Sequence, residues 1–338
     1  MPAVQILHLG AQVMTHRVDT NALAERVLKG DRRAVARAIS LVENRDPVAE
    51  ELTRRLFPHT GRAQRVGITG PPGVGKSSLI SSLISVVRSK GKTVGVISVD
   101  PSSPFTRGAL LGDRIRLTDH FLDPDVFIRS MGSRGHLGGL SETTLEASLV
   151  LDAAGNDVIF LETVGVGQSE IEVVRVSDTV VLVLMPGSGD SIQALKAGVM
   201  EIPDIVAVNK KDHPQADQTI DEIYGMFCLR GERGGWTPPV VGTQALTGEG
   251  VEELWEQIEG HVAWARECGE FNKRRARQLE HEVFALALQR MGERMRREAR
   301  SNPDLAGILQ SVAQRETDPL SAVRQVLTRV FSVEDDEV

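Results

Sequence analysis

The chain has little cysteine, and its histidines do not cluster. Its 338 residues include two cysteines, Cys228 and Cys268, which stand far apart without a C-x-x-C pair, and eight scattered histidines. A disulfide scaffold or a cysteine-based zinc site cannot organise such a chain. Both cysteines are therefore expected to be reduced and to carry no special function.

The sequence also lacks a long apolar run and an excess of positive charge. The longest candidate run, residues 180–185, stops at Pro186-Gly187, well short of the ~20 residues that span a membrane. Residues 1–5 lack the basic start of a secretory signal. The 39 Lys+Arg against 46 Asp+Glu give a formal net charge of −7, a poor composition for binding nucleic acid. We expect a cytoplasmic protein without a membrane or nucleic-acid partner.

The composition is that of a folded globular protein. The spacing of apolar residues divides the chain into three regions. Residues 1–61 show apolar positions at helical spacing, with helices expected over 20–29, 31–43 and 47–57. Residues 266–338 return to helix, including a long amphipathic stretch over 277–300 whose basic residues alternate with glutamates, as on a solvated face. The sequence therefore predicts a central domain over 62–265 between two helical extensions.

The central region alternates short Val/Ile/Leu-rich runs with helical stretches. Strands are expected over residues 65–69, 93–99, 126–129, 157–161, 179–184, 205–208 and 239–242. Continuous apolar runs are typical of strands that helices cover on both faces. The region is therefore predicted to be an α/β fold with a mostly parallel sheet flanked by helices, and ligands in such sheets bind beyond the carboxyl ends of the strands.

A phosphate-binding motif follows the first of these strands. Gly70-Pro71-Pro72-Gly73-Val74-Gly75-Lys76-Ser77 fits the pattern G-x-x-x-x-G-K-[ST] and precedes a predicted helix that includes Ser78. Glycines let backbone amides turn toward phosphate oxygens, and the helix N-terminus adds its positive dipole end. Lys76 would supply a charge to the β- and γ-phosphates, and Ser77 a hydroxyl to Mg²⁺.

A second motif at a later strand end indicates which base is bound. Asn209-Lys210-Lys211-Asp212 reads N-K-x-D. A carboxylate at Asp212 can accept from the ring N–H and the exocyclic amine of guanine, whereas adenine offers no such donors and would leave the charge unpaired. After the next strand, the backbone amide of Ala245, followed by Leu246, is expected near the guanine carbonyl oxygen. The motif favours GTP over ATP.

Three acidic residues at or after neighbouring strand ends predict a magnesium site. Asp100 ends one strand, Asp113 lies in the segment that follows, and Glu162 ends another. Mg²⁺ takes only one or two carboxylates directly and keeps several waters, so some of these acids must act through water. Gly165, just beyond Glu162, can free an amide for the γ-phosphate and make its loop sensitive to the nucleotide state. The glycine-rich stretch over 132–139 is expected to be a loop.

Taken together, the motifs GPPGVGKS, VDPSSP, LLGD, GHLGG, ETVGVGQSE and NKxD resemble those of the MeaB/ArgK family of P-loop GTPases. The resemblance implies a GTPase that is an accessory chaperone of an adenosylcobalamin-dependent acyl-CoA mutase, gates its cofactor loading, protects it and is activated by it. It also implies a homodimer. The chain departs from the family pattern at Arg107-Gly108-Ala109 and at Gln244.

The predicted site can be stated residue by residue. GTP or GDP is expected to contact Gly70, Pro71, Pro72, Gly73, Val74, Gly75, Lys76, Ser77, Ser78, Gly165, Asn209, Lys210, Asp212, Ala245 and Leu246. Mg²⁺ is expected at Ser77, Asp100, Asp113 and Glu162. By the resemblance, Lys76, Asp113 and Glu162 carry the catalytic roles.

Two other functions stay open for the same motifs. One is a metallochaperone GTPase for nickel or cobalt enzymes, although such proteins usually carry His-rich or Cys motifs. The other is an ArgK-type kinase or ATPase linked to amino-acid transport, which the guanine-reading Asp212 disfavours.

Overall fold

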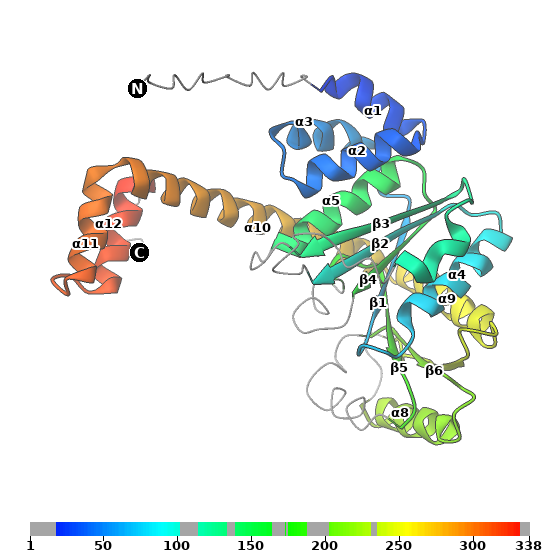
Figure 1. Ribbon diagram of the computed structural model, residues 1–338. Helices are drawn as coiled ribbons and strands as arrows, with labels where there is room; N and C mark the ends of the chain where they lie inside the picture. Colours follow the sequence, from blue (N-terminus) through cyan, green and yellow to red (C-terminus); the bar gives the residue numbers. More distant parts are fainter. Residues whose placement is uncertain are drawn as a thin grey trace, which may run out of the picture. The chain divides into compact units, whose positions relative to one another are not determined.

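The computed structural model describes residues 18–101, 114–133, 139–163, 173, 175–187, 203–230 and 235–331 (Figure 1). Its centre is one seven-stranded sheet in the order β3-β2-β4-β1-β5-β6-β7, and all the paired strands run parallel. The strands are β1 (Gln64–Thr69), β2 (Val94–Pro101), β3 (Val126–Ser133), β4 (Val158–Thr163), β5 (Thr179–Leu184), β6 (Ile205–Asn209) and β7 (Val240–Thr243). The predicted fold class and all seven predicted strands are confirmed.

Several strands extend beyond their predicted ends, and β3 does so by the most. The stretch over 132–139 was expected to be a loop, but Gly132 and Ser133 continue β3 by pairing with Asp100 and Pro101 of β2. At its other end, Gly139 begins helix α5 (Gly139–Ala153). Pairing with a neighbouring strand overrides the low strand propensity of glycine here.

Helices cover both faces of the sheet, as continuous apolar strands require. On one face, helices α4 (Lys76–Ser89) and α9 (Val251–Glu267) pack against side chains such as Val66, Ile68 and Phe160. On the other face, α5 packs against side chains such as Ile97 and Leu161. Figure 1 shows the two helix layers on opposite sides of β2 and β4.

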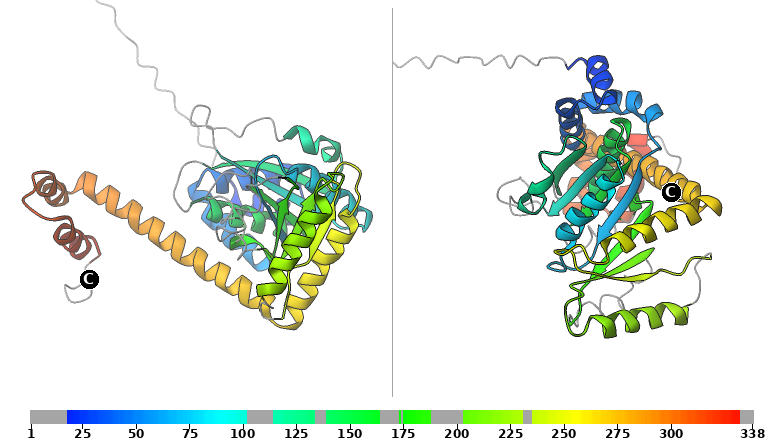
Figure 2. Two further views of the ribbon diagram at one scale, coloured as in Figure 1. Left: turned by 90° about the horizontal axis from the view of Figure 1, so that it is seen from below. Right: turned by 90° about the vertical axis from the view of Figure 1, so that its right-hand side faces the viewer.

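The remaining helices of the sheet-containing part extend these two layers. Helix α8 (Ala216–Arg230) contributes Ile223 and Phe227 to a small core with β5 and β6. The right-hand view of Figure 2 shows α8 at the end of the sheet opposite the N-terminal helices. A short 3-10 helix, η2 (Arg114–His120), packs on α4 through the buried Leu117.

The N-terminal helices join the α5 layer and begin where aspartates can cap them. They are α1 (Thr20–Leu28), α2 (Arg32–Glu43) and α3 (Pro47–Leu56), followed by the 3-10 turn η1 (Phe57–His59). Asp19, Asp31 and Asp46 each accept from backbone amides of the helix they precede. Such caps satisfy amides that the first helical turn leaves without a partner, so these helix starts follow from local sequence.

The chain divides into two compact units, and the boundary along the sequence follows Phe271. The described part of the second unit runs from Asn272 to Phe331 and contains most of α10 (Glu270–Ser301), with α11 (Pro303–Ala313) and α12 (Pro319–Phe331). Its own core consists of Leu305, Ile308, Ala322 and Val330. Helix α10 begins at Glu270 rather than at Arg277 as predicted, because α9 ends at Glu267 and the next helix starts directly after the left-handed Gly269.

Among the described residues, no helix is both long enough and apolar enough to cross a membrane.

Candidate nucleotide site

The loop between β1 and α4 has the backbone conformation of a phosphate cradle. Gly70, Gly73 and Gly75 all have positive φ angles, of 138°, 80° and 93°. A Cβ on Gly70 would lie 2.1 Å from the carbonyl oxygen of Val183 in β5, so only glycine fits there. The loop delivers the chain to the N-terminus of α4, where no side chain caps the first amides. These amides remain for an anion.

Lys76 begins α4, and its side chain is buried beneath the loop. Its Nζ donates to the carbonyl oxygens of Gly70 at 2.7 Å and Pro71 at 3.0 Å. Burying an ammonium group is costly unless its hydrogens are satisfied, and these carbonyls satisfy at least two of them. The lysine is therefore held inside the loop, close to where the motif requires it.

The next residue of α4 meets a carboxylate from the sheet. Ser77 donates its hydroxyl to Oε1 of Glu162, at the end of β4, with an Oγ–Oε1 distance of 2.6 Å. Ser98 of β2 donates to the other oxygen, Oε2, at 3.1 Å. All three side chains are buried, with Glu162 only 2% exposed. The structure thus brings Ser77 and Glu162 together, as a shared metal site would require.

Asn209 connects three separate parts of the site. Its Nδ2 donates to the carbonyl oxygen of Val74 in the loop after β1 at 2.8 Å. Its Oδ1 accepts from the Ala245 amide at 3.1 Å and from the Thr243 hydroxyl at 3.3 Å. The carboxamide therefore holds the phosphate loop and the loop after β7 in one arrangement.

Lys210 adopts an unusual backbone conformation beside Asn209. Its φ of 62° is left-handed, which is uncommon for a residue with a Cβ. The side chain lies over the phosphate loop, where Nζ donates to the Gly73 carbonyl oxygen at 3.1 Å and to the sulfur of Met185 at 3.3 Å. Strained conformations of this kind persist where a functional loop over-determines them.

The residues predicted to read the base lie on the two loops beside this lysine. Asp212 is exposed in the turn after β6. The Ala245 amide is occupied by Asn209, whereas the amide of exposed Leu246 has no partner within the described part of the chain. The Ala245 carbonyl oxygen accepts from the Ser82 hydroxyl of α4 at 2.6 Å.

A surface ion pair braces the same loops. Lys211 contacts Glu249 with an Nζ–Oε1 distance of 3.0 Å. The hydrogen bond that Lys211 donates to Glu249 raises the pKa of Lys211 above its ordinary value. Because the pair is exposed to solvent, it orients the loop without stabilising it much.

The remaining predicted metal residues are placed only in part. Asp100 is the seventh residue of β2, and β2 is the direct neighbour of β4, so the strand ends bearing Asp100 and Glu162 adjoin. Asp113 and Gly165 lie outside the described residues. Within the described ranges, no group of three or more His, Cys, Asp or Glu side chains could hold a metal ion.

Four contacts in the site have no signal in the sequence. Ser98, Ser82 and Thr243 donate hydroxyl hydrogen bonds to site residues, and Met185 accepts from Lys210. None belongs to a recognisable motif. Each contact depends on how distant strands and helices are registered, which residue spacing alone does not reveal.

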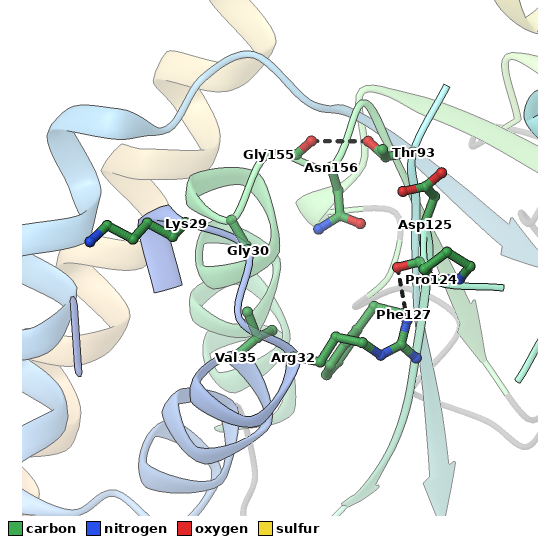
Figure 3. Close-up of a pocket in the computed structure, with 11 residues that line it drawn as sticks. Lys29, Gly30, Arg32, Val35, Thr93, Pro124, Asp125, Phe127, Gly155 and Asn156 are labelled. Carbon is green, nitrogen blue, oxygen red and sulfur yellow. Dashed lines mark hydrogen bonds between the residues drawn. The ribbon is translucent and has the colours of Figure 1, made fainter. Parts of the chain in front are cut away.

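A pocket of about 250 Å³ lies elsewhere, at the amino ends of the strands (Figure 3). Thr93 and Asp125 line it from the starts of β2 and β3, Gly155 and Asn156 from the turn before β4, and Arg32 from α2. Arg32 donates to the carbonyl oxygens of Asp123, Pro124 and Val126, which ties α2 to the sheet. Phosphate-loop residues line none of it, so it is separate from the nucleotide site.

The parallel sheet, the glycine loop leading into α4 and the N-K-x-D turn define a P-loop nucleotide-binding protein. Comparison with known proteins narrows this class. The family model described as "Methylmalonyl Co-A mutase-associated GTPase MeaB" matches residues 35–300, so the chain belongs to the MeaB family and is a GTPase that binds GTP and GDP. The resemblance to the MeaB/ArgK family of P-loop GTPases, predicted from the motifs, is confirmed.

Relatives and solved structures agree with this assignment. A protein of Pyrococcus horikoshii whose name describes it as a GTPase is 49% identical over 311 residues, covering 91% of this chain and 97% of the relative. The mouse "Methylmalonic aciduria type A homolog, mitochondrial" is 34% identical, covering 76% of this chain and 66% of that protein. A crystal structure titled "LAO/AO transport system kinase" superposes with a TM-score of 0.67 at 28% identity, covering 91% of this chain and 96% of that one.

Proposed function

We propose that this GTPase is a Mg²⁺-dependent accessory chaperone of an adenosylcobalamin-dependent acyl-CoA mutase of the methylmalonyl-CoA mutase type, gating its cofactor loading and protecting it. The observation that carries the proposal is the family match over residues 35–300, whose description names this mutase. The chain's part in that task is a nucleotide switch, which its own residues can operate.

Phosphate binding starts from an arrangement that is already assembled. The Lys76 ammonium now donates to the carbonyls of Gly70 and Pro71. Phosphate oxygens offer it charged acceptors in place of neutral ones, and charge-assisted hydrogen bonds are roughly twice as strong. Lys76 would therefore turn toward the β- and γ-phosphates without leaving its buried position. The N-terminus of α4, which no N-cap side chain caps, completes the cradle.

The residues near the γ-phosphate fit Mg²⁺. They are hard oxygen donors, as Mg²⁺ prefers, and they are buried under the phosphate loop. Ser77 would hold the ion through its Oγ lone pairs while still donating its proton to Glu162, because a hydroxyl is both donor and acceptor. Since both Glu162 oxygens already accept from serines, we assign Glu162 to orienting Ser77 and a bound water. Asp100 and Asp113 would supply the remaining contacts. The ion, when bound, neutralises charge between the β- and γ-phosphates.

Guanine would be read by the loops that Asn209 joins. The Asp212 carboxylate would accept from the two nitrogens of the guanine edge, and the Lys210 stem would pack on the base plane. The Leu246 amide, which has no partner among the described residues, would face the guanine carbonyl oxygen, and Ala245 would hold this loop in place through its amide bond to Asn209. The contact of Asn209 with Val74 links base recognition to the phosphate loop.

We further propose that the chain works as a homodimer through its helical extensions, over residues 1–61 and 266–338. Support comes from a stripe of exposed apolar side chains on α10: Leu279, Val283, Phe284, Leu288 and Met291. Successive members are four, one, four and three residues apart, which places them within one half of the helix surface. An exposed apolar stripe of this length on a basic helix is typical of a protein interface.

The chaperone proposal is tested by nucleotide-dependent association with the mutase. The purified protein is immobilised and exposed to a methylmalonyl-CoA mutase with a non-hydrolysable GTP analogue or with GDP. We expect retention that differs between the two nucleotides, and no such difference for the Lys76→Ala variant. Equal retention, or none, with both nucleotides would refute the client assignment.

A further inference from the structure

Ser98 stands beside the proposed metal site without belonging to any motif. It is the fifth residue of β2, is 3% exposed, and pairs across the sheet with Glu162 of β4. Its hydroxyl donates to Oε2 of Glu162 at 3.1 Å, while Ser77 donates to Oε1 at 2.6 Å. Both oxygens of the Glu162 carboxylate therefore accept a hydrogen bond, one from α4 and one from β2.

The two hydrogen bonds restrict the orientation of the Glu162 carboxylate. A glutamate side chain has three rotatable bonds, and each hydrogen bond to its carboxylate restricts the positions that the two oxygens can take. The Ser98 hydroxyl adds such a restriction at Oε2, the oxygen that Ser77 does not contact. The pairing of β2 with β4 fixes the backbone of Ser98, so its short side chain holds the carboxylate from a fixed position in the sheet.

We propose that Ser98 is a positioning residue for Mg²⁺: by holding Oε2 of Glu162, it sets the direction in which Oε1 holds the Ser77 hydroxyl, and so the orientation of the Ser77 lone pairs toward the metal. The inference rests on the proposed Mg²⁺ site. Ser98 touches neither the metal nor the nucleotide. Groups that orient metal ligands from behind typically change metal affinity 10–100-fold when removed.

The chain offers a matched control on the neighbouring strand. Ser130 of β3 is 8% exposed and pairs with Ser98 at the same level of the sheet. It shows no hydrogen bond to Glu162 among the contacts of the described residues. Ser130→Ala removes a similar buried hydroxyl from the same layer. Ser98→Thr keeps the hydroxyl and suits a strand, so it tests whether the oxygen itself matters.

The test measures release of a fluorescent GDP analogue by stopped flow, over a Mg²⁺ titration that includes an EDTA limit. For Ser98→Ala we expect the Mg²⁺ concentration that half-maximally slows release to rise about tenfold, with the EDTA-limit rate unchanged. Ser98→Thr should stay near wild type, and Ser130→Ala should match it.

The outcomes separate this inference from the function it rests on. Release from the wild type that does not respond to Mg²⁺ would remove the proposed metal site itself. A Mg²⁺-sensitive wild type with an unshifted Ser98→Ala would overturn the role of Ser98 alone. So would a Ser98→Ala variant that releases nucleotide faster in EDTA by the same factor as in Mg²⁺, since that result marks a general loosening of the site.

Discussion

At the scale of single residues, we expect the buried ammonium of Lys76 to determine whether a triphosphate can bind. Replacing it with alanine would remove the charge proposed to face the β- and γ-phosphates and would leave the Gly70 and Pro71 carbonyls without their donor. We expect Lys76→Ala to weaken GTP binding at least 100-fold, roughly the loss of one buried charged contact. Calorimetric titration measures this, with the exposed Lys90→Ala as control. Unchanged affinity in Lys76→Ala would place the nucleotide elsewhere.

Asp212 should determine which base is accepted. In Asp212→Asn the side chain gains a donor and loses its charge, so it no longer complements guanine but can pair with the additional carbonyl oxygen of xanthine. We expect GTP affinity to fall and XTP affinity to rise, reversing the preference. A competition assay against labelled GTP reports both, with Asp217→Asn on α8 as the matched exposed control. A GTP/XTP ratio equal to the wild type would contradict base reading by this carboxylate.

The residues that a motif names were predictable, and their partners were not. Lys76, Ser77 and Asn209 are found by spacing, because the motif encodes a local loop conformation. Ser98 is found only when β2 and β4 are paired, since its contact with Glu162 spans 64 positions along the chain. Long-range register decides such contacts, and residue spacing does not contain it.

At the scale of elements, the loop between β1 and α4 depends on glycine for two different reasons. Gly70 has a φ of 138° and faces the Val183 carbonyl oxygen, whereas Gly73 has a φ of 80° and open space around it. We expect Gly73→Ala to cost about 1 kcal/mol of stability, the penalty of a left-handed residue. Gly70→Ala adds a backbone clash and should cost several times more, with loss of GTP binding.

Denaturant unfolding and GTP titration of the two glycine variants test this distinction. The structure requires Gly70→Ala to be clearly worse in both measurements. Variants of equal stability and equal affinity would mean that the approach of the loop to β5 does not constrain it.

The attachment of the turn between η2 and β3 to α4 should depend on pH through Asp123. Arg88 of α4 holds Asp123 with an Nε–Oδ2 distance of 2.8 Å, and this hydrogen bond lowers the pKa of Asp123 below its ordinary value. A carboxyl whose pKa is lowered by folding stabilises the folded state above its unfolded pKa of about 4, and that contribution is lost as the pH falls through the folded value.

We therefore expect Asp123→Asn to lose about 1 kcal/mol at pH 7 and less near pH 3, because the wild-type contribution declines below the unfolded pKa and is lost as the pH falls through the lowered folded pKa. Urea unfolding at both pH values measures the difference, and the exposed Asp119→Asn is the control. A loss in Asp123→Asn that is the same at both pH values would refute the charge-based account.

Helix starts with Asp or Asp-Pro were correctly placed from sequence because a cap is a local interaction. The 3-10 helix η2 was not predicted, because its conformation depends on a distant surface: Leu117 is buried against α4, and His120 lies 3.0 Å from the Ser81 hydroxyl. The extension of β3 to Ser133 was missed for the same reason, since it depends on pairing with β2.

At the scale of the whole molecule, the exposed apolar stripe on α10 predicts self-association. Leu288 is 69% exposed in its centre, so a charge there should not disturb a core. We expect Leu288→Glu to shift the protein from dimer to monomer with its thermal stability as a monomer unchanged, because a charge in the centre of an apolar interface is left unpaired. Light scattering after size-exclusion chromatography measures the mass. A dimer that persists in Leu288→Glu, or a wild-type monomer, would remove the stripe from the proposed interface.

The site between β1, β4 and β6 is proposed to be a GTP switch whose hydrolysis rate responds to a mutase client. The most direct test is the rate of GTP hydrolysis by the purified protein in Mg²⁺, measured with and without an adenosylcobalamin-dependent acyl-CoA mutase. We predict slow turnover alone, since no motif in the sequence supplies an arginine to the transferred phosphate, and a clear acceleration when the mutase is added. A rate that the mutase leaves unchanged at saturating concentration would contradict the account.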